Sequence, residues 1–216
     1  AVGTESEILA EYIADQVVDC RGKILLPGLI NAHTHVPMTL LRGLADDLRL
    51  DVWLMGYMMP VEREFVSPDF VRLGTRLACA EMIRSGVTCF ADMYYFEEEV
   101  AKATAEIGMR ALCSQTVLKF TTPDAQFYEE SLEMSRDFIS RWKGHDLIVP
   151  SVAPHAPYTC PPDFLKLAAK KAAQENLGIH IHVSETENQV VLSLKEHGIT
   201  PVQMLEETGV LDVPTI

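Results

Sequence analysis

The sequence predicts an α/β fold, a (β/α) barrel in which parallel strands alternate with helices. Strand-like and helix-like segments alternate with short connections, and a glycine follows nearly every helix. An open doubly wound sheet also fits that alternation. Polar residues favour the barrel, because a barrel builds its site from the carboxyl ends of several strands, and no Gly-x-Gly-x-x-Gly motif follows the first strand. The polar residues at or just beyond those ends are His33, His35, Asp92, Gln115, His155, His182 and Glu185.

The individual elements follow from periodicity and from residues that begin or end helices. Residues 1–21 show no helical period, whereas the apolar run from Ile24 to Ile30 continues toward His35 as a strand. Ser67 and Pro68 are typical of a helix start. The expected strands are 24–35, 87–91, 111–118, 147–152 and 179–183, and the expected helices are 70–83, 97–107, 124–143, 162–177, 187–197 and 201–208.

Composition limits the classes of partner. The 216 residues carry a formal net charge of −13, from 18 basic and 31 acidic residues, which argues against binding to nucleic acid or to an anionic membrane surface. No apolar stretch is long enough to span a bilayer. The cysteines number five, with no Cys-x-x-Cys pair, which predicts reduced thiols in a cytoplasmic protein.

Three histidines and one glutamate form the candidate site. Side chains alternate between the two faces of a strand, so His33 and His35, which are two residues apart, point to the same side. Two imidazoles on one side can bind one divalent metal ion. Two solvated loop histidines are the alternative. His182 ends a later strand of the same series and can supply a third ligand. Glu185 follows after a short turn, so it leaves the strand face and suits a general acid/base beside the metal.

Four segments resemble the amidohydrolase superfamily: PGLINAHTH, GVTCFADMY, PHAPYTC and HIHVSET. The resemblance is closest to the methylthioadenosine/S-adenosylhomocysteine deaminases and their chlorohydrolase relatives. It implies that His33, His35 and His182 bind one divalent metal ion, zinc, with iron, manganese or nickel as alternatives, and that Glu185 is the proton shuttle.

The same resemblance implies a set of substrate-binding residues. Trp53 and Glu62 match the substrate-side tryptophan and glutamate of the subgroup, and Glu62 would accept hydrogen bonds from ribose hydroxyls. His155 matches the histidine that contacts the nucleoside. Other interpretations stay open: a core aromatic for Trp53, an ion pair with Arg63 for Glu62, and a turn residue for His155. Asp92 is expected to be a structural hydrogen-bond acceptor.

Gln115 departs from the family pattern. Some members carry an arginine there, thought to help hold the amino-acid tail of the substrate, and glutamine has no charge to pair with a carboxylate. Because Gln115 stands at the position of that arginine, we place it among the substrate-binding residues. We expect 5′-substituted adenosines with small apolar 5′ groups to be preferred over S-adenosylhomocysteine.

The larger departure is length. Family members continue into a sixth strand with a histidine, a later strand with a metal-binding aspartate, and a small β-sandwich closed by both termini. Residues 1–22 are therefore expected to be a remnant of that N-terminal β-sandwich. Residues 23–216 are expected to be the N-terminal portion of an incomplete (β/α)8 barrel, about the first five units. Such a fragment is expected to be inactive by itself.

The resemblance implies a metal-dependent hydrolytic deaminase of 5′-substituted adenosines that releases ammonia and the inosine analogue. Its partner would be a small nucleoside, and a homo-oligomer is also compatible with the sequence. Two alternatives stay open. The protein could act on another base or on a triazine, like guanine deaminases and chlorohydrolases, or it could be a non-catalytic metal-binding scaffold.

Overall fold

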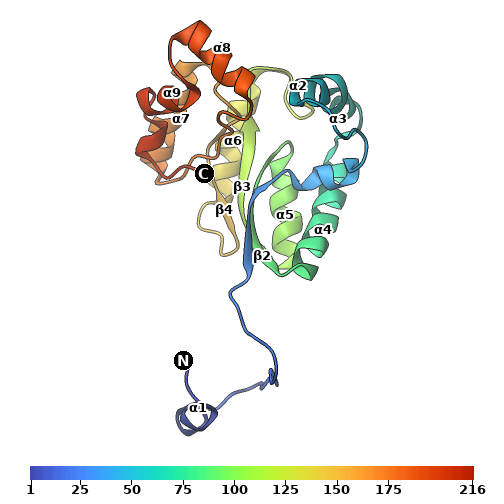
Figure 1. The fold of residues 1–216 in the computed structure, drawn as a ribbon, viewed down its shortest axis with the longest axis vertical. Helices are drawn as coiled ribbons and strands as arrows, with labels where there is room; N and C mark the ends of the chain where they lie inside the picture. Colours follow the sequence, from blue (N-terminus) through green and yellow to red (C-terminus); the bar gives the residue numbers. More distant parts are fainter.

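A parallel sheet that follows the chain order forms the centre of the molecule (Figure 1). The computed structural model describes residues 1–216. The sheet runs in the order β1 (Leu29–Thr34), β2 (Val87–Tyr94), β3 (Arg110–Val117) and β4 (Ile148–Pro150), and β5 (Ala153–Pro154) pairs with the far end of β3. A doubly wound sheet would reverse its strand order partway. The sequential order therefore confirms the prediction of a barrel arc.

The predicted strand 179–183 lies in the expected place but is much less regular. Ile179 forms isolated parallel bridges with Val152 on one side and Thr215 on the other. The backbone N–H of His182 donates to the carbonyl of His155 at 2.9 Å, so the segment still continues the arc. Pro150 and Pro154 have no N–H to donate, which interrupts the neighbouring ladder. The prediction was right in position and wrong in extent.

The helices that follow the strands mostly match their predicted limits. Ser67 caps α4 (Pro68–Arg84), since its Oγ accepts a hydrogen bond from the backbone N–H of Phe70 at 3.3 Å. Gly108 ends α5 in the left-handed conformation, with φ 86°. From α4 onward the α-helices are α4, α5 (Glu97–Ile107), α6 (Tyr128–Trp142), α7 (Pro162–Glu175), α8 (Glu187–His197) and α9 (Pro201–Glu207).

Two helix ends differ from the prediction, each for a local reason. Helix α6 begins at Tyr128 rather than at residue 124, because Asp124 is held in the preceding loop. Its carboxylate accepts hydrogen bonds from the backbone N–H of Phe96 at 2.7 Å and from the hydroxyl of Thr122 at 2.7 Å. Helix α7 ends in Asn176, with φ 53°, instead of at the predicted glycine, since asparagine tolerates this conformation.

The amino-terminal part contains one helix and no strand before β1. Helix α1 (Glu5–Glu11) begins at a capping box between Thr4 and Glu7, which the sequence analysis missed, and none of its residues is buried. Figure 1 shows this segment extended away from the sheet. A β-sandwich would need strands from elsewhere, so the assignment of residues 1–22 to such a domain stays a prediction.

The segment between β1 and α4 lies beside the carboxyl ends of the strands. It is made of short helical pieces: η1 (Val36–Leu41), α2 (Leu50–Trp53), η2 (Leu54–Met58) and α3 (Met59–Phe65); one further turn, η3 (Val210–Asp212), follows α9. One buried cluster joins α4 and α5 to the sheet, and a second surrounds α7. Against this packed base the strand ends are held in fixed positions. No helix is both long and apolar enough to cross a membrane.

Candidate metal centre and adjoining pocket

The structure brings His33, His35 and His182 together at the carboxyl ends of the strands. Their ring centroids lie 5.1 to 5.3 Å apart, and one possible ligand atom from each lies within 4.8 Å of the others. Bond lengths of about 2.0–2.1 Å around a tetrahedral zinc ion place ligand nitrogens roughly 3.4 Å apart. Small rotations of the rings therefore suffice for the three histidines to hold one ion.

Backbone carbonyls fix the orientation of two of these rings. Nδ1 of His35 donates to the carbonyl of Met93 at 2.6 Å, and Nδ1 of His182 donates to the carbonyl of His155 at 3.0 Å. Each bond leaves Nε2 as the free lone pair, as expected of metal-binding histidines. Burial lowers the pKa of His35 to about 4 and also lowers the pKa of His182. Both rings are therefore neutral near pH 7 and available as ligands.

Asp92 holds the backbone around the first two histidines. Its Oδ1 accepts hydrogen bonds from the hydroxyl of Thr34 at 2.6 Å and from the backbone N–H of Val36 at 2.7 Å. These two donors flank His35 in the chain. Asp92 is completely buried and lies outside the histidine cluster. Its expected role as a structural hydrogen-bond acceptor is confirmed.

Behind Asp92 lies a second buried carboxyl group, that of Glu97. Glu97 Oε1 accepts from the backbone N–H of Ser114 at 3.0 Å. Glu97 Oε2 and Asp92 Oδ2 are both buried, and neither has a hydrogen-bond partner elsewhere in the protein. Burial raises the pKa of Asp92 to about 7, although hydrogen bonds from Thr34, Val36 and Glu97 act in the opposite direction. Burial and the nearby charge of Asp92 raise the pKa of Glu97 well above its usual range. A neutral Glu97 that donates its proton to Asp92 satisfies both oxygens.

A pocket of about 70 Å³ adjoins the histidines, and we call it the histidine pocket. It brings together most of the residues that the sequence analysis selected from distant parts of the chain: Trp53, Glu62, His155 and Glu185, beside His35 and His182. Its other lining residues are Met38, Leu50, Leu54, Met93, Tyr94, Tyr95, Thr116 and Tyr158. This composition, apolar with a few convergent polar groups, is typical of a small-molecule site.

Glu62 points into this pocket from α3 and is buried. Its Oε1 accepts a hydrogen bond from the hydroxyl of Tyr94 at 2.7 Å, and it forms no ion pair with Arg63. Burial raises the pKa of Glu62 to about 7, although the bond from Tyr94 acts in the opposite direction. The interpretation of Glu62 as half of a surface ion pair is therefore wrong.

His155 and Trp53 also face the pocket. Nδ1 of His155 lies 2.9 Å from the hydroxyl of Thr159, and its ring centroid lies 4.9 Å from that of His182. Burial lowers the pKa of His155 to about 3, which keeps the ring neutral. Trp53 is half-buried at the end of α2 and lies in neither buried cluster. Neither residue is a simple turn or core residue.

Glu185 leaves the strand face through a turn at Ser184. Ser184 has φ 52°, a left-handed conformation that is uncommon outside glycine, and it redirects the chain just before Glu185. The backbone N–H of Glu185 donates to Oε1 of Gln189 at 3.0 Å, and Gln189 Nε2 donates to Glu185 Oε2 at 3.4 Å. The side chain is exposed at the pocket edge, where a proton-transferring carboxylate is expected.

Gln115 does not line the histidine pocket. It is 2% exposed, its Oε1 accepts from the backbone N–H of Glu97 at 3.2 Å, and its Nε2 donates to Asp124 at 2.9 Å. Both ends of the amide are therefore bonded within the protein. The structure gives Gln115 a structural role and no contact with the pocket.

Tyr94 and Tyr158 are among the pocket residues that the sequence analysis did not select. Tyr94 extends β2 past Asp92 and could have been found by the same strand-end rule. Tyr158 lies in the loop before α7, with its ring centroid 5.9 Å from that of His155. No periodic pattern marks Tyr158, because irregular loop geometry determines its direction.

Three clustered histidines and an adjoining carboxylate, at the carboxyl edge of a parallel α/β sheet, define the class of metal-dependent α/β-barrel proteins. The chain belongs to the amidohydrolase family, whose sequence model matches residues 24–216.

Individual relatives agree with this assignment. The chain is 44% identical over 214 residues to the 5-methylthioadenosine/S-adenosylhomocysteine deaminase of Thermodesulfovibrio yellowstonii, covering 98% of this chain and 48% of the relative. It is 44% identical over 213 residues to a 5'-deoxyadenosine deaminase of Methanothermobacter thermautotrophicus, covering 98% of this chain and 49% of the relative. The chain therefore spans about half the length of these relatives.

A solved structure shows the same arrangement of elements. The fold superimposes on an adenosine deaminase from Xanthomonas campestris with bound zinc, with a TM-score of 0.83 and 40% identity. The match covers 85% of this chain and 42% of that chain. The arc of parallel strands is thus part of the family's barrel, as the sequence predicted.

Proposed function

We propose that the complete protein is a metal-dependent hydrolytic deaminase of 5′-substituted adenosines. The observation that carries this proposal is the histidine pocket, where Glu62, His155 and Glu185 converge beside the histidine cluster. The deaminase names of relatives at 44% identity support the same chemistry and the same substrate class. The product would be the inosine analogue, with release of ammonia.

His33, His35 and His182 would hold the ion, and the donor set of imidazoles suits zinc. When bound, a divalent ion supplies Lewis acidity that lowers the pKa of water toward about 7. The zinc in the Xanthomonas campestris structure supports this choice of metal. Iron, manganese and nickel remain alternatives that metal analysis of the purified protein distinguishes.

Glu185 would carry the proton. Its exposed carboxylate stands at the edge of the histidine pocket, where it accepts a proton from the attacking water and delivers it to the purine ring nitrogen. Gln189 would orient this carboxylate, because its Nε2 donates to Glu185 Oε2 while its Oε1 accepts from the backbone N–H of Glu185. Ammonia then leaves from C6 of the purine.

The other pocket residues would orient the nucleoside. Glu62 accepts hydrogen bonds from ribose hydroxyls, and Tyr94 holds its carboxylate in place. Neutral His155 offers Nε2 to the nucleoside, since its Nδ1 faces Thr159. Trp53 contributes an apolar surface to the wall of the pocket.

Removal of the proton carrier tests the proposal. In the full-length protein, Glu185→Gln should lower kcat for methylthioadenosine by at least about 10²-fold, with metal content unchanged. Glu187→Gln is the matched control, because Glu187 is an exposed carboxylate two residues away that does not line the histidine pocket. His33→Ala should lower both metal content and turnover. Turnover of guanine or a chlorotriazine, with none of methylthioadenosine, would overturn the assignment of substrate.

A further inference from the structure

His180 is a buried histidine that the proposed reaction does not use. It stands two residues before His182, so both side chains project from the same face of their segment. His180 is 5% exposed and lies outside the cluster of possible metal ligands. Because a buried imidazole needs hydrogen-bond partners, the partners of His180 indicate what the side chain does.

Two buried serines form a chain of hydrogen bonds with His180. The Oγ of Ser114, on β3, lies 3.3 Å from Nδ1 of His180 and 2.5 Å from Oγ of Ser151, and both serines are fully buried. Ser114 stands two residues before Thr116, which lines the histidine pocket, so Ser114 lies on the same face of β3 and deeper in the arc. The chain Ser151–Ser114–His180 therefore joins β3 to the segment of His182 beneath the pocket.

The backbone ladder on the side of β5 does not by itself fix the register of this segment. The backbone N–H of His180 donates to the carbonyl of Val152, and that of His182 donates to the carbonyl of His155, both at 2.9 Å. The segment advances two residues between these bonds while the neighbouring chain advances three, so one extra residue interrupts the ladder. Pro154, within the interruption, has no N–H that could add a bond. Side chains must therefore contribute to the register.

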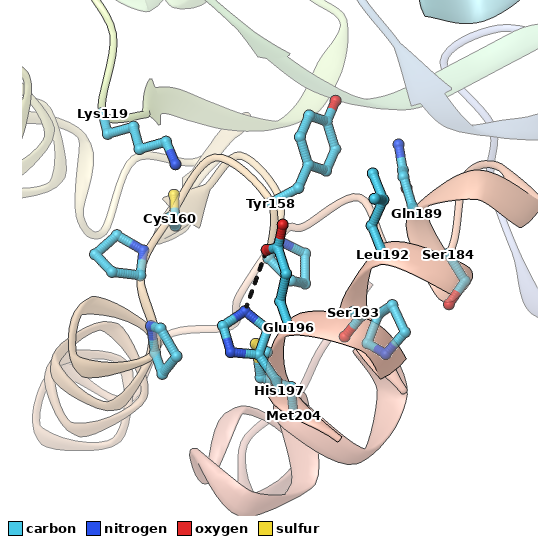
Figure 2. A pocket seen from close by; sticks show the side chains of 14 residues that line it. Lys119, Tyr158, Cys160, Ser184, Gln189, Leu192, Ser193, Glu196, His197 and Met204 are labelled. Atoms are coloured by element: carbon cyan, nitrogen blue, oxygen red, sulfur yellow. Dashed lines mark ion pairs between the residues drawn. The ribbon is translucent and has the colours of Figure 1, made fainter. Parts of the chain in front are cut away.

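Packing on the side of α8 gives the segment little further support. A cavity of about 460 Å³ lies between α8 and the loop before α7, and Ser184 and Gln189 line it (Figure 2). Ser193 is the one buried residue of α8. The chain that leaves His182 thus borders a cavity instead of a packed core, and the contacts before His182, at His180, carry more weight.

We propose that His180 is a positioning residue for the metal centre: its hydrogen bond to Ser114 fixes the register of the segment that carries His182. A slip of one residue would turn His182 to the opposite face, away from His33 and His35. The same slip would separate His180 from Ser114, so this bond forms only in the register that completes the histidine cluster. The inference rests on the metal site of the proposed deaminase function, and it concerns the affinity for the ion.

The zinc affinity of the full-length protein tests the role of this bond. His180→Leu and Ser114→Ala each remove it, and each should weaken zinc binding roughly 10-fold in chelator competition. Ser114→Ala is the milder change and decides the test where His180→Leu does not fold. His180→Asn is the conservative variant, because its amide can place a hydrogen-bonding atom near the position of Nδ1, and its zinc affinity should stay within about threefold of the wild type.

A matched control separates positioning from general stability. Ser131 is a buried serine of α6 whose Oγ donates to the carbonyl of Thr116 at 3.0 Å. Ser131→Ala also removes one buried hydrogen bond, so urea unfolding should show a loss of stability similar to that of Ser114→Ala. Its zinc affinity should equal that of the wild type, because Ser131 has no bond to the segment of His182.

A double-mutant cycle shows whether His180 acts through His182. In a His182→Ala background, His180→Leu should cause no further loss of zinc affinity. In a His33→Ala background the loss of roughly 10-fold should persist, because His182 still contributes to the site there. A further loss of that size in the His182→Ala background would overturn the inference.

Two other results would also overturn it. One is wild-type zinc affinity in both His180→Leu and Ser114→Ala, and the other is an equal loss of affinity in Ser131→Ala. Failure of the proposed function is a separate result, seen in the wild type. A full-length protein that binds zinc and deaminates no 5′-substituted adenosine would overturn the deaminase assignment, while the comparison of zinc affinities would still decide the role of His180.

Discussion

The hydroxyl of Thr34 lies 2.6 Å from Oδ1 of Asp92, and this contact ties the end of β1 to the neighbouring strand β2. The same hydroxyl lies 2.7 Å from the carbonyl of Ala91. Thr34 lies between His33 and His35 in the chain. The hydrogen bonds of its hydroxyl therefore fix the backbone between two histidines of the candidate metal centre. The fully buried Asp92 also accepts from Val36, and it therefore holds the chain on both sides of His35.

Replacement of Thr34 should weaken both stability and metal binding. Thr34→Val keeps the shape of the side chain but leaves buried Asp92 with one donor fewer on Oδ1, which should cost about 1–3 kcal/mol of unfolding free energy. Thr34→Ser retains the hydroxyl and is the control. Urea unfolding and chelator competition for zinc measure the two effects. Wild-type zinc affinity in Thr34→Val would show that this bond does not position the histidines.

The sequence predicted those parts of the site that depend on strand periodicity. His33 and His35 share a face because strand residues alternate, and His182 joins them because parallel strands end at one edge. Gln115 also follows a strand, but its amide is captured by Glu97 and Asp124, contacts that no local pattern announces. Tertiary contacts therefore decided the direction of that side chain.

Loop residues were the least predictable part. Tyr158 lines the histidine pocket because of the path of the loop before α7, which no periodic pattern in the sequence describes. The start of α6 shows the same limit, since Asp124 satisfies backbone groups of another segment in place of beginning a helix. Periodicity describes regular elements well, and hydrogen bonds between distant segments decide the rest.

Substitution of Glu97 should reveal its protonation state. Glu97→Gln keeps a neutral group that can donate to Asp92 and accept from Ser114, so the unfolding free energy near pH 7 should change by less than about 1 kcal/mol. Glu97→Ala removes the donor and leaves a void, which should cost about 2–4 kcal/mol. Chemical denaturation measures both. A large loss in Glu97→Gln would indicate that Glu97 is ionised.

Gln115→Arg should act on stability and leave substrate preference unchanged. The buried amide accepts from Glu97 and donates to Asp124, and loss of these bonds should cost about 1–3 kcal/mol of unfolding free energy. The ratio of kcat/KM for methylthioadenosine and S-adenosylhomocysteine should not change. Gln115→Asn, with the same amide on a shorter side chain, separates loss of the bonds from the added charge. A shifted ratio without destabilisation would return Gln115 to the substrate site.

Glu62 should make the stability of the protein depend on pH. Burial raises its pKa from 4.5 to about 7 in the folded state, so the folded protein binds more protons than the unfolded chain between these values. The contribution of Glu62 to the unfolding free energy is therefore highest below this window and falls as pH rises toward 7, by up to about 1.4 kcal/mol per pH unit. Above the folded-state pKa of about 7, Glu62 is ionised in both states, and the unfolding free energy is lowered by the full cost of its buried charge.

Glu62→Gln should remove that slope, because glutamine does not titrate and can still pair with the hydroxyl of Tyr94. Urea unfolding at several pH values between about 5 and 8 compares the variant with the wild type. Tyr94→Phe is a second informative variant, since loss of the donor should raise the pKa of Glu62 further and extend the slope to higher pH.

Because ribose hydroxyls donate to the ionised carboxylate, KM for the nucleoside should fall as pH rises through about 7 in the wild type and stay flat in Glu62→Gln. Parallel pH profiles in the two proteins would show that Glu62 titrates outside this range and does not govern nucleoside binding.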